Sequence, residues 1–470
     1  MLIPESDYTR WDAVDMARLV RDGEVSPADL AETARAMIER RPALNAVADL
    51  AADPPAGPAP CGPLAGVPFA VKELLAWPGL PWTFGSRLMA ANPAPGHTPY
   101  AARLRDAGLA VLCSTTSSEF GLLGSTESAL RGPTLNPWGP GLSAGGSSGG
   151  SAALVAAGVF PMAHGSDGGG SLRVPAALNE VFGFKPSKGR CVPVGPDTPG
   201  LPALVVEHGM SRSVRDSAQL LAVTERTGPD AVYPPVGLVA GPGAERLRIA
   251  VLAPTLTGRD PDPAVARELD RTAALCADLG HDVDVAGDPG VDGAALSRGF
   301  FAAAAVTMAQ VAAMVTPMLG RRPGPGELEP FTLELIDCAA TLGPAALADS
   351  ERALAEGARA YLRLFEHCDV VLSPTLAVPC WPLGHLSPAA GRETLLRRTE
   401  EAVGYTPVHN PAGCPAMSVP LGRCDGLPVG MHFAARPGAD GMLLALAAEL
   451  EAAAPWADVR PDTAWLTGRG

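Results

Sequence analysis

The sequence predicts an α/β protein with a central mixed β-sheet, flanking helices and a variable helical lobe. Helical and strand-like patterns alternate along the first half of the chain, which is typical of α/β folds. Strand-like runs occur near both ends, whereas alanine-rich helical segments dominate the middle. We therefore expect one sheet built from both ends of the chain, to which residues 230–400 add a lobe.

The elements of the N-terminal half can be predicted in order. A helix should begin at Ser26, where a serine cap, a proline at the first helical position and an acid in the first turn coincide. A Pro/Gly-rich linker, Asp53–Gly62, precedes an apolar, strand-like run that ends in Lys72. The elements expected next are a helix over Tyr100–Ala107, a strand over Ala110–Cys113, a helix over Ala152–Val159 and a strand over Phe160–Ala163.

Beyond about residue 225 the expected elements change in character. They are strands over Leu247–Leu252, Asp282–Val285 and Val370–Leu372, helices over Pro263–Leu279, 297–319 and 345–366, a strand-and-loop return over Tyr405–Gly422 and Gly426–Phe433, and a closing helix over Ala439–Ala453. The stretch Phe300–Leu319 carries no charge over 20 residues, which is long enough to span a bilayer. Because alanine contributes little insertion energy and Gln310 and Pro317 interrupt the stretch, we expect a buried helix that lines a core or pocket.

Composition and charge restrict the function classes. The chain has 470 residues, of which 47% are hydrophobic and 18% charged, as in ordinary globular proteins. Its formal net charge of −14, without a basic run, argues against a nucleic-acid or anionic-membrane partner. Nine scattered cysteines without a C-x-x-C pair, and no charged-then-apolar leader, favour a reduced, cytoplasmic protein without a disulfide framework or zinc site.

The most informative stretch is Ser143–Ser171, in which two Gly/Ser clusters bracket an apolar, helix-like segment. The clusters are Gly145–Ser151 and Gly165–Ser171. A flexible linker would not enclose a segment built to be buried. Consecutive glycines let backbone N–H groups approach a ligand oxygen, as an oxyanion-binding loop requires. The second cluster therefore predicts a nucleophile, Ser171, beside such a loop.

A competing serine motif is the nucleophile elbow G-x-S-x-G. It occurs around Ser143 and again around Ser148. An elbow needs a strand directly before the serine, but the segment NPWGP (136–140) precedes Ser143 and cannot be a strand. The histidines downstream have no distinguishing context, so the pattern gives little support to a hydrolase elbow.

A serine nucleophile also needs a base. Lys72, at the end of an apolar run, can accept a proton if burial lowers its pKa enough to leave neutral amine. A surface lysine that merely ends a strand would look the same in the sequence. Spacing alone does not place this lysine beside Ser171.

Several long motifs, in order, resemble the amidase signature family. They are GPLAGVPFAVK (62–72), GGSSGGS (145–151), GSDGGGSLRVP (165–175), GFKPSKGR (183–190), SRSVRD (211–216) and DGLPVG (425–430). The resemblance covers residues 10–225 nearly throughout and 370–452 more loosely. It implies an amidase-signature fold in one domain: N-terminal helices over 1–60, a catalytic core over 61–225, a substrate-shaping lobe over 226–400 and a C-terminal return over 401–470.

The same resemblance implies site residues. Ser171 would be the nucleophile, Ser147 a bridging serine on a cis peptide bond and Lys72 the base; the 24-residue separation selects Ser147 over Ser148. The backbone of Gly168, Gly169 and Gly170 would form the oxyanion hole. Supporting roles fall to two ions that brace the loop, Asp167 and Arg173. Glu73 and Gly168 depart from the commonest family pattern, and Gly168 should loosen the loop or open the pocket.

The implied function is hydrolysis of an amide C–N bond of a small molecule through an acyl-enzyme, without cofactor or metal, in a chain that could form a homodimer. The motif around Ser171 and YTPVHN (405–410) are similar to the branch with 6-aminohexanoate cyclic-dimer (nylon-oligomer) hydrolases. One alternative is the amidase subunit of a tRNA-dependent amidotransferase, which releases ammonia for a partner. Another is a non-catalytic binding protein on the same scaffold. The sequence does not identify the amide.

Overall fold

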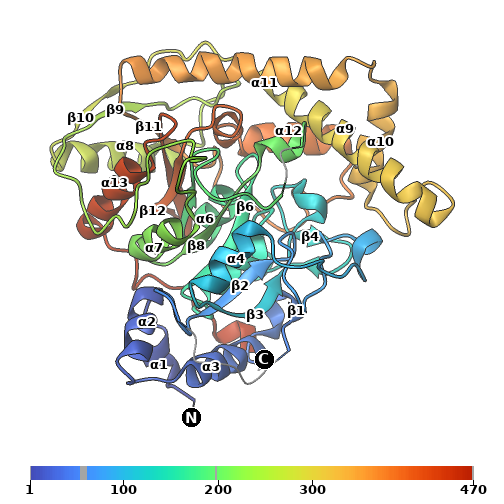
Figure 1. Ribbon diagram of the computed structural model, residues 1–470. Helices are drawn as coiled ribbons and strands as arrows, with labels where there is room; N and C mark the ends of the chain where they lie inside the picture. The colour runs from blue at the N-terminus through green and yellow to red at the C-terminus, as the bar shows by residue number, and fades with distance from the viewer. Residues whose placement is uncertain (1, 53–60, 196–197, 468–470) are drawn as a thin grey trace.

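The main body of the protein is an eight-stranded mixed sheet with the strand order β10-β9-β11-β13-β12-β7-β8-β6 (Figure 1). The computed structural model describes residues 2–52, 61–195 and 198–467, so the expected linker Asp53–Gly62 lies outside the described residues up to Pro60. Neighbours β10, β9 and β11 pair in parallel and the others antiparallel, which confirms a mixed sheet. The strands are β6 (Met162–Asp167), β7 (Phe182–Lys185), β8 (Val206–Ser211), β9 (Arg248–Val251), β10 (Asp282–Val285), β11 (Val370–Pro374), β12 (Ala416–Cys424) and β13 (Leu427–Ala435).

A smaller, three-stranded sheet lies beside the edge strand β6. It has the order β1-β3-β2, where β1 is Val47–Leu50, β2 is Pro68–Lys72 and β3 is Ala110–Thr115. Strand β2 contacts β6, but the backbone N–H of Lys72 donates to the His164 side chain (3.2 Å) instead of to a backbone carbonyl. The expectation of one sheet is therefore corrected to two adjoining sheets, and a two-residue hairpin, β4 (Glu127–Ser128) with β5 (Gly132–Pro133), lies apart from both.

The helices begin largely where local chemistry predicts. At α3 the Ser26 side chain accepts a hydrogen bond from the Asp29 N–H, as the cap motif requires. Two helices of the middle region, α10 and α12, were not expected. The helices are α1 (Glu5–Tyr8), α2 (Ala13–Arg21), α3 (Pro27–Glu39), α4 (Pro99–Asp106), α5 (Gly149–Ala156), α6 (Arg173–Asn179), α7 (Val214–Thr224), α8 (Pro263–Asp278), α9 (Gly293–Leu319), α10 (Pro330–Thr341), α11 (Ala346–Leu362), α12 (Arg392–Ala402) and α13 (Asp440–Ala453).

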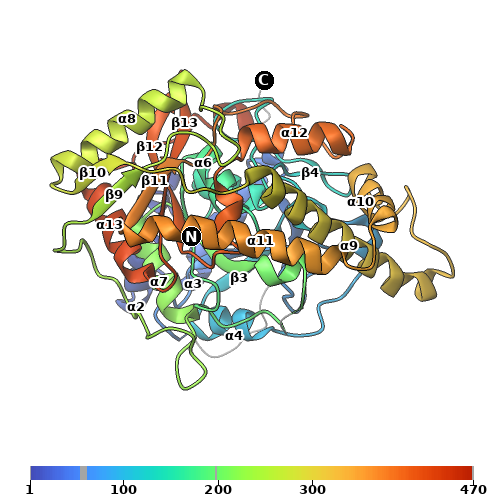
Figure 2. The same cartoon turned by 90° about the horizontal axis from the view of Figure 1, so that it is seen from above.

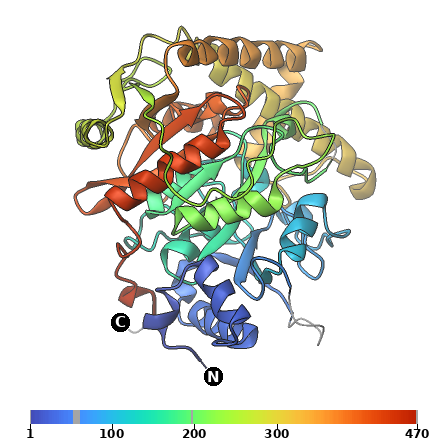
Figure 3. The ribbon, with the colours of Figure 1, turned by 60° about the vertical axis from the view of Figure 1, so that its left-hand side comes forward.

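Helices α6 and α13 cover opposite faces of the sheet, because side chains alternate along β13. A Cβ at Gly430 would lie 2.6 Å from Ala177 of α6, whereas Met431 joins a buried cluster with Leu443 of α13. Figure 3 shows α13, in red, beside α7, in green, in front of the sheet.

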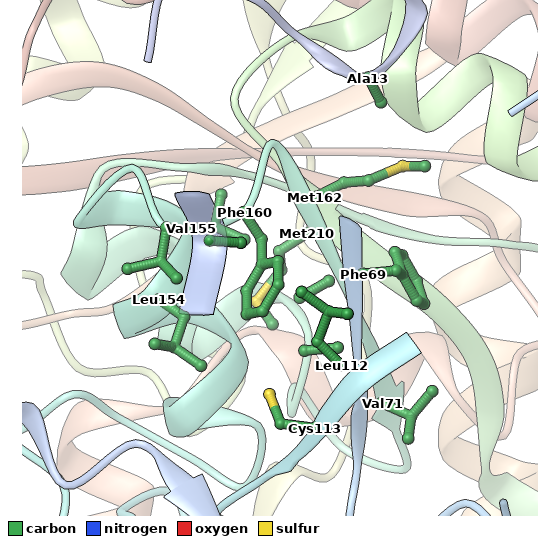
Figure 4. Close-up of a cluster of buried hydrophobic side chains, with 14 of the residues drawn as sticks. Ala13, Phe69, Val71, Leu112, Cys113, Leu154, Val155, Phe160, Met162 and Met210 are labelled. Carbon is green, nitrogen blue, oxygen red and sulfur yellow. The ribbon is translucent and has the colours of Figure 1, made fainter. Parts of the chain in front are cut away.

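The largest buried cluster joins the two sheets. Figure 4 shows Phe69 and Val71 of β2 on one side of the cluster and Leu154 and Val155 of α5 on the other, with Met162 of β6 above them. All eight residues of α5 are buried, as expected for the segment between the two Gly/Ser clusters. The first Gly/Ser cluster, Gly145–Ser151, runs into the start of this helix, and the second, Gly165–Ser171, begins within β6, nine residues after the helix ends.

Helices α9 to α12 form a lobe along the top and right of the molecule in Figure 1, also visible from above in Figure 2. Within the described residues, α9 is the one single helix long and apolar enough to cross a bilayer, and 33% of its most apolar window is buried. It packs against α10 and α11, and residues between Gly293 and Val311 line a cavity, but Met314 and Met318 near its end are 72% and 85% exposed. The expectation of a buried, pocket-lining helix over Phe300–Leu319 is therefore confirmed only for the first part of this stretch. Residues 226–400 thus supply both this lobe and strands β9, β10 and β11 of the main sheet.

Candidate active site

A cavity of about 600 Å³ opens between the sheet edge and the helical lobe. This volume falls within the range of small-molecule sites. Ser147, Ser166 and the loop Gly168–Ser171 form part of its wall, and the remainder is mostly aromatic and aliphatic. The two Gly/Ser clusters predicted from the sequence therefore meet at one cavity.

Lys72 lies at the end of β2, fully buried behind the serines. Its Nζ donates to Ser147 Oγ at 2.7 Å and to Ser166 Oγ at 3.0 Å. Burial lowers the pKa of Lys72 from 10.5 to about 8, against the opposing charges of Glu207, Asp167 and Glu73. An appreciable fraction of the amine is therefore neutral near pH 7, and the expected contact between Lys72 and Ser147 is present.

Ser147 follows a cis peptide bond from Gly146, as the resemblance implied. No side chain fits at the preceding glycine, because a Cβ at Gly146 would lie 2.6 Å from the backbone N and O of Ser125. Ser171 is half-buried on the same cavity wall. The described residues contain no hydrogen bond between the hydroxyls of Ser147 and Ser171.

The loop Gly168–Ser171 connects β6 to α6 and is held by Asp167. The Asp167 carboxylate accepts hydrogen bonds from the backbone N–H of Gly170 (2.7 Å) and of Leu172 (3.1 Å). The expectation that Gly170 contributes its N–H to the oxyanion hole is therefore corrected, because this N–H already donates to Asp167. The backbone N–H groups of Gly168, Gly169 and Ser171 have no partner within the described residues, and all three residues line the cavity.

Arg173 joins this loop to the C-terminal region. Its guanidinium donates twice to Asp167 (both 2.9 Å), to the Thr406 carbonyl at 3.0 Å and to Asn410 Oδ1 at 2.9 Å. Although burial alone would raise the pKa of Asp167, the charge and hydrogen bonds of Arg173 outweigh it and hold that pKa well below its usual range. Both ions are fully buried, and neither lines the cavity, in keeping with the expected supporting role.

Residues far along the chain complete the loop's support. Thr406 Oγ1 donates to the Gly169 carbonyl at 2.7 Å, and Asn410 Nδ2 donates to the Asp167 carbonyl at 2.8 Å. Both residues belong to the segment YTPVHN (405–410), which resembles the branch with 6-aminohexanoate cyclic-dimer hydrolases. No role was predicted for either residue. On the lobe side, a Cβ at Gly169 would lie 2.9 Å from the ring of Phe300, so α9 packs directly on the loop.

A second group of polar side chains, His164, Ser166 and Glu207, lies around Lys72 and was not anticipated. His164 Nδ1 accepts from the Lys72 N–H, so its Nε2 carries the proton and donates to Glu207 Oε2 at 2.9 Å. Glu207 lines the cavity. His164 and Ser166 come from β6 (Met162–Asp167), whereas the predicted strand ended at Ala163.

Comparisons with known proteins consistently indicate one family. The Amidase family model matches residues 40–444. AmiC of Mycobacterium tuberculosis is 38% identical over 462 residues, covering 95% of each chain, and an acylamidase of Rhodococcus erythropolis is 35% identical over 482 residues, covering 96% of each. The solved structure of a 6-aminohexanoate cyclic dimer hydrolase superposes with a TM-score of 0.88 at 30% identity, covering 97% of this chain and 99% of that one.

The chain therefore belongs to the amidase family. It is an amidohydrolase that acts on amide C–N bonds, and its fold is the amidase-signature α/β fold. One subunit of the glutamyl-tRNA(Gln) amidotransferase of Acidothermus cellulolyticus is 34% identical over 95% of each chain. The amidotransferase alternative is less supported than the amidase assignment, because that identity is below the 38% of AmiC.

Proposed function

We propose that this amidase cleaves a small-molecule amide with Ser171 as nucleophile, Ser147 as proton relay and Lys72 as base. The observation that carries the proposal is the 2.7 Å hydrogen bond from a fully buried lysine amine to the Ser147 hydroxyl, on the cavity wall that also bears Ser171. A lysine whose pKa is about 8 can act as a base near neutral pH.

The first half-reaction forms an acyl-enzyme. Neutral Lys72 takes the proton of Ser147 as Ser147 takes that of Ser171, and Ser171 Oγ bonds to the substrate carbonyl carbon. The relay then returns a proton to the departing amine as the C–N bond breaks. Water repeats the sequence: it loses a proton to the relay, attacks the ester carbonyl and releases the acid with Ser171 restored. Since hydrogen bonds between catalytic groups often form only in the substrate complex, we assign the Ser147–Ser171 contact to that complex.

The oxyanion of each tetrahedral intermediate would bind to backbone donors. We assign this role to the N–H groups of Gly168, Gly169 and Ser171, because Gly170 already donates to Asp167. Preorganised donors of this kind each contribute roughly 3–4 kcal/mol to barrier lowering. The buried Asp167–Arg173 pair keeps the loop in place without touching substrate.

A fluorophosphonate probe tests the nucleophile directly. Wild-type protein should be labelled at Ser171, and Ser171→Ala should lose both labelling and amide turnover. Ser143→Ala is the matched control, since Ser143 lies in the competing G-x-S-x-G motif and does not line the cavity; this variant should still be labelled. Labelling that persists in Ser171→Ala and disappears in Ser143→Ala would overturn the assignment.

The proposal also covers the cellular compartment, the domain organisation, the oligomeric state and the part of the chain that sets substrate preference. The nine cysteines are unpaired, which supports a reducing compartment such as the cytoplasm. We also assign residues 1–470 to one domain and allow a homodimer, which light scattering at several concentrations would test. Residues 226–400 would shape substrate preference, because α9 and α12 supply much of the cavity wall away from the serines.

A further inference from the structure

The cavity wall carries two acidic side chains and, among the described residues that line it, no Lys, Arg or His. The acids are Glu207 and Glu400. Lys72 reaches the cavity only from behind Ser147 and Ser166. A substrate with its own carboxylate would thus meet negative charge and no cation on these walls, whereas a cationic substrate would find a counter-charge.

The two acids differ in what already surrounds them. Glu207 accepts from His164 and lies close enough to Lys72 to raise that lysine's pKa. It therefore already offsets the positive charge that the base acquires during turnover. Glu400 accepts one hydrogen bond, from Ser297 Oγ at 2.5 Å, and forms no ion pair within the described residues.

Glu400 lines the cavity and is linked through Ser297 to the part of α9 that packs on the Gly168–Ser171 loop. Its partner Ser297 lies on α9 three residues before Phe300, which is roughly 5 Å along the helix axis. The Phe300 ring itself packs on Gly169. From the other side, Glu400 precedes Thr406 by six residues, and Thr406 bonds the same loop. A substrate whose carbonyl lies at this loop can therefore place a side group at Glu400 by crossing the apolar space beside Phe300.

Glu400 is half-buried, and a carboxylate without an ion-pair partner on the wall of a mostly apolar cavity attracts an ammonium group. Resting on the proposed hydrolysis at Ser171, we propose that the preferred amides carry a protonated amine, separated from the scissile carbonyl by an apolar spacer, and that Glu400 binds this ammonium. Glu400 is then a specificity-determining residue, held in position by Ser297. Amides bearing a free carboxylate are disfavoured.

Binding to the Ser171→Ala protein tests this separately from catalysis. The ligands are anilides of ω-amino acids over a series of chain lengths and N-(ω-aminoalkyl)benzamides, which place the ammonium on the acyl or on the amine side. Each is compared by calorimetry with an isostere ending in methyl and one ending in carboxylate. We expect at least one ammonium ligand to bind more tightly than its methyl isostere, and the carboxylate ligands to bind at least tenfold more weakly than that ammonium ligand.

The matched variants are Glu400→Gln and Glu401→Gln, each made in the Ser171→Ala protein. Glu401 is the adjacent residue on α12, but it pairs with Arg259 and Arg397 outside the cavity. Glu400→Gln should lower the ratio of ammonium to methyl-isostere affinity about tenfold, and Glu401→Gln should leave this ratio unchanged. Circular dichroism and thermal melting confirm that each variant is folded.

The outcomes separate this inference from the proposed function. An unchanged ratio of ammonium to methyl-isostere affinity in Glu400→Gln overturns the inference, whether or not the amides are hydrolysed. So do carboxylate ligands that bind as well as ammonium ligands in both the acyl-side and the amine-side series. Failure of the fluorophosphonate to label Ser171 overturns the proposed function while leaving this binding result valid in its own right.

Discussion

Replacing Lys72 with methionine should abolish amide hydrolysis and yet stabilise the protein near neutral pH. Methionine is about as long as lysine and carries no charge. The variant removes the proposed base and also removes a buried ammonium group from the core, so activity and stability should change in opposite directions.

The size of the effect follows from the pKa and the contacts of Lys72. Lowering its pKa from 10.5 to about 8 means that the protonated side chain costs the folded state about 3 kcal/mol. Methionine gives up the hydrogen bonds to Ser147 and Ser166, each worth about 1 kcal/mol. Near pH 7 the variant should therefore be about 1 kcal/mol more stable than the wild type.

The difference should depend on pH with a definite sign. Below pH 8 the full cost of the buried charge is present in the wild type. Between pH 8 and 10.5 the unfolded chain binds more protons at Lys72 than the folded chain, so wild-type stability rises with pH. Above 10.5 the amine is neutral in both states, and the methionine variant should be about 2 kcal/mol less stable, having only lost hydrogen bonds.

Urea denaturation of both proteins at several pH values from 7 to 11 measures this difference, and contributions from all other groups cancel between the two. Turnover of an amide is measured in parallel. A variant that is less stable than wild type by the same amount at every pH would show that Lys72 is not a desolvated amine. An active variant would show that it is not the base.

Three further predictions concern the same loop and base. Wild-type kcat/KM should rise with pH through about 8 as the buried Lys72 amine loses its proton. Glu207→Gln should shift this rise to lower pH, because the charge of Glu207 raises the pKa of Lys72. A pH–rate profile of both proteins measures the direction of the shift, and a shift to higher pH would contradict the prediction. Gly169→Ala should lower kcat/KM by roughly tenfold to a hundredfold, because its Cβ would lie 2.9 Å from the Phe300 ring, and adding Phe300→Ala should restore part of the loss; absence of any rescue in steady-state assays would refute the crowding. Asp167→Asn should destabilise the protein by roughly 3–5 kcal/mol, since it leaves a buried guanidinium without its carboxylate; an unchanged melting temperature would contradict this.

Much of the catalytic half could be predicted because its signals are local. The cap at Ser26 needs only four consecutive residues, and the structure has the predicted bond. The triad candidates lie in Gly-rich motifs with fixed spacing, and Lys72 and Ser147 are indeed in contact. No role for Asn179 was predicted from the sequence, but its Nδ2 donates to the carbonyl of Ala144 at 2.8 Å and so connects α6 to the residue before the first Gly/Ser cluster.

The remaining features depend on contacts between distant parts of the chain. Nothing near Thr406 shows that its hydroxyl bonds the carbonyl of Gly169, which is 237 residues away. Likewise, the hydrogen bond from the Gly170 N–H to the Asp167 carboxylate depends on the conformation of the Asp167 side chain, which the sequence does not give. The strand predicted over Phe160–Ala163 is instead Met162–Asp167, which is β6. Gly165 and Ser166 have low strand propensity, but β6 pairs with β8 along its whole length, and this pairing places both residues in the strand.

The dependence of the Gly168–Ser171 loop on Thr406 and Asn410 has a consequence during synthesis. A ribosome makes the nucleophile when about a third of the chain exists, but the side chains that hold its loop emerge only after residue 410. We expect a nascent chain arrested before that point to bind fluorophosphonate poorly even though Lys72, Ser147 and Ser171 are all present. Such a delay would keep Ser171 of an incomplete polypeptide from being acylated by cellular amides.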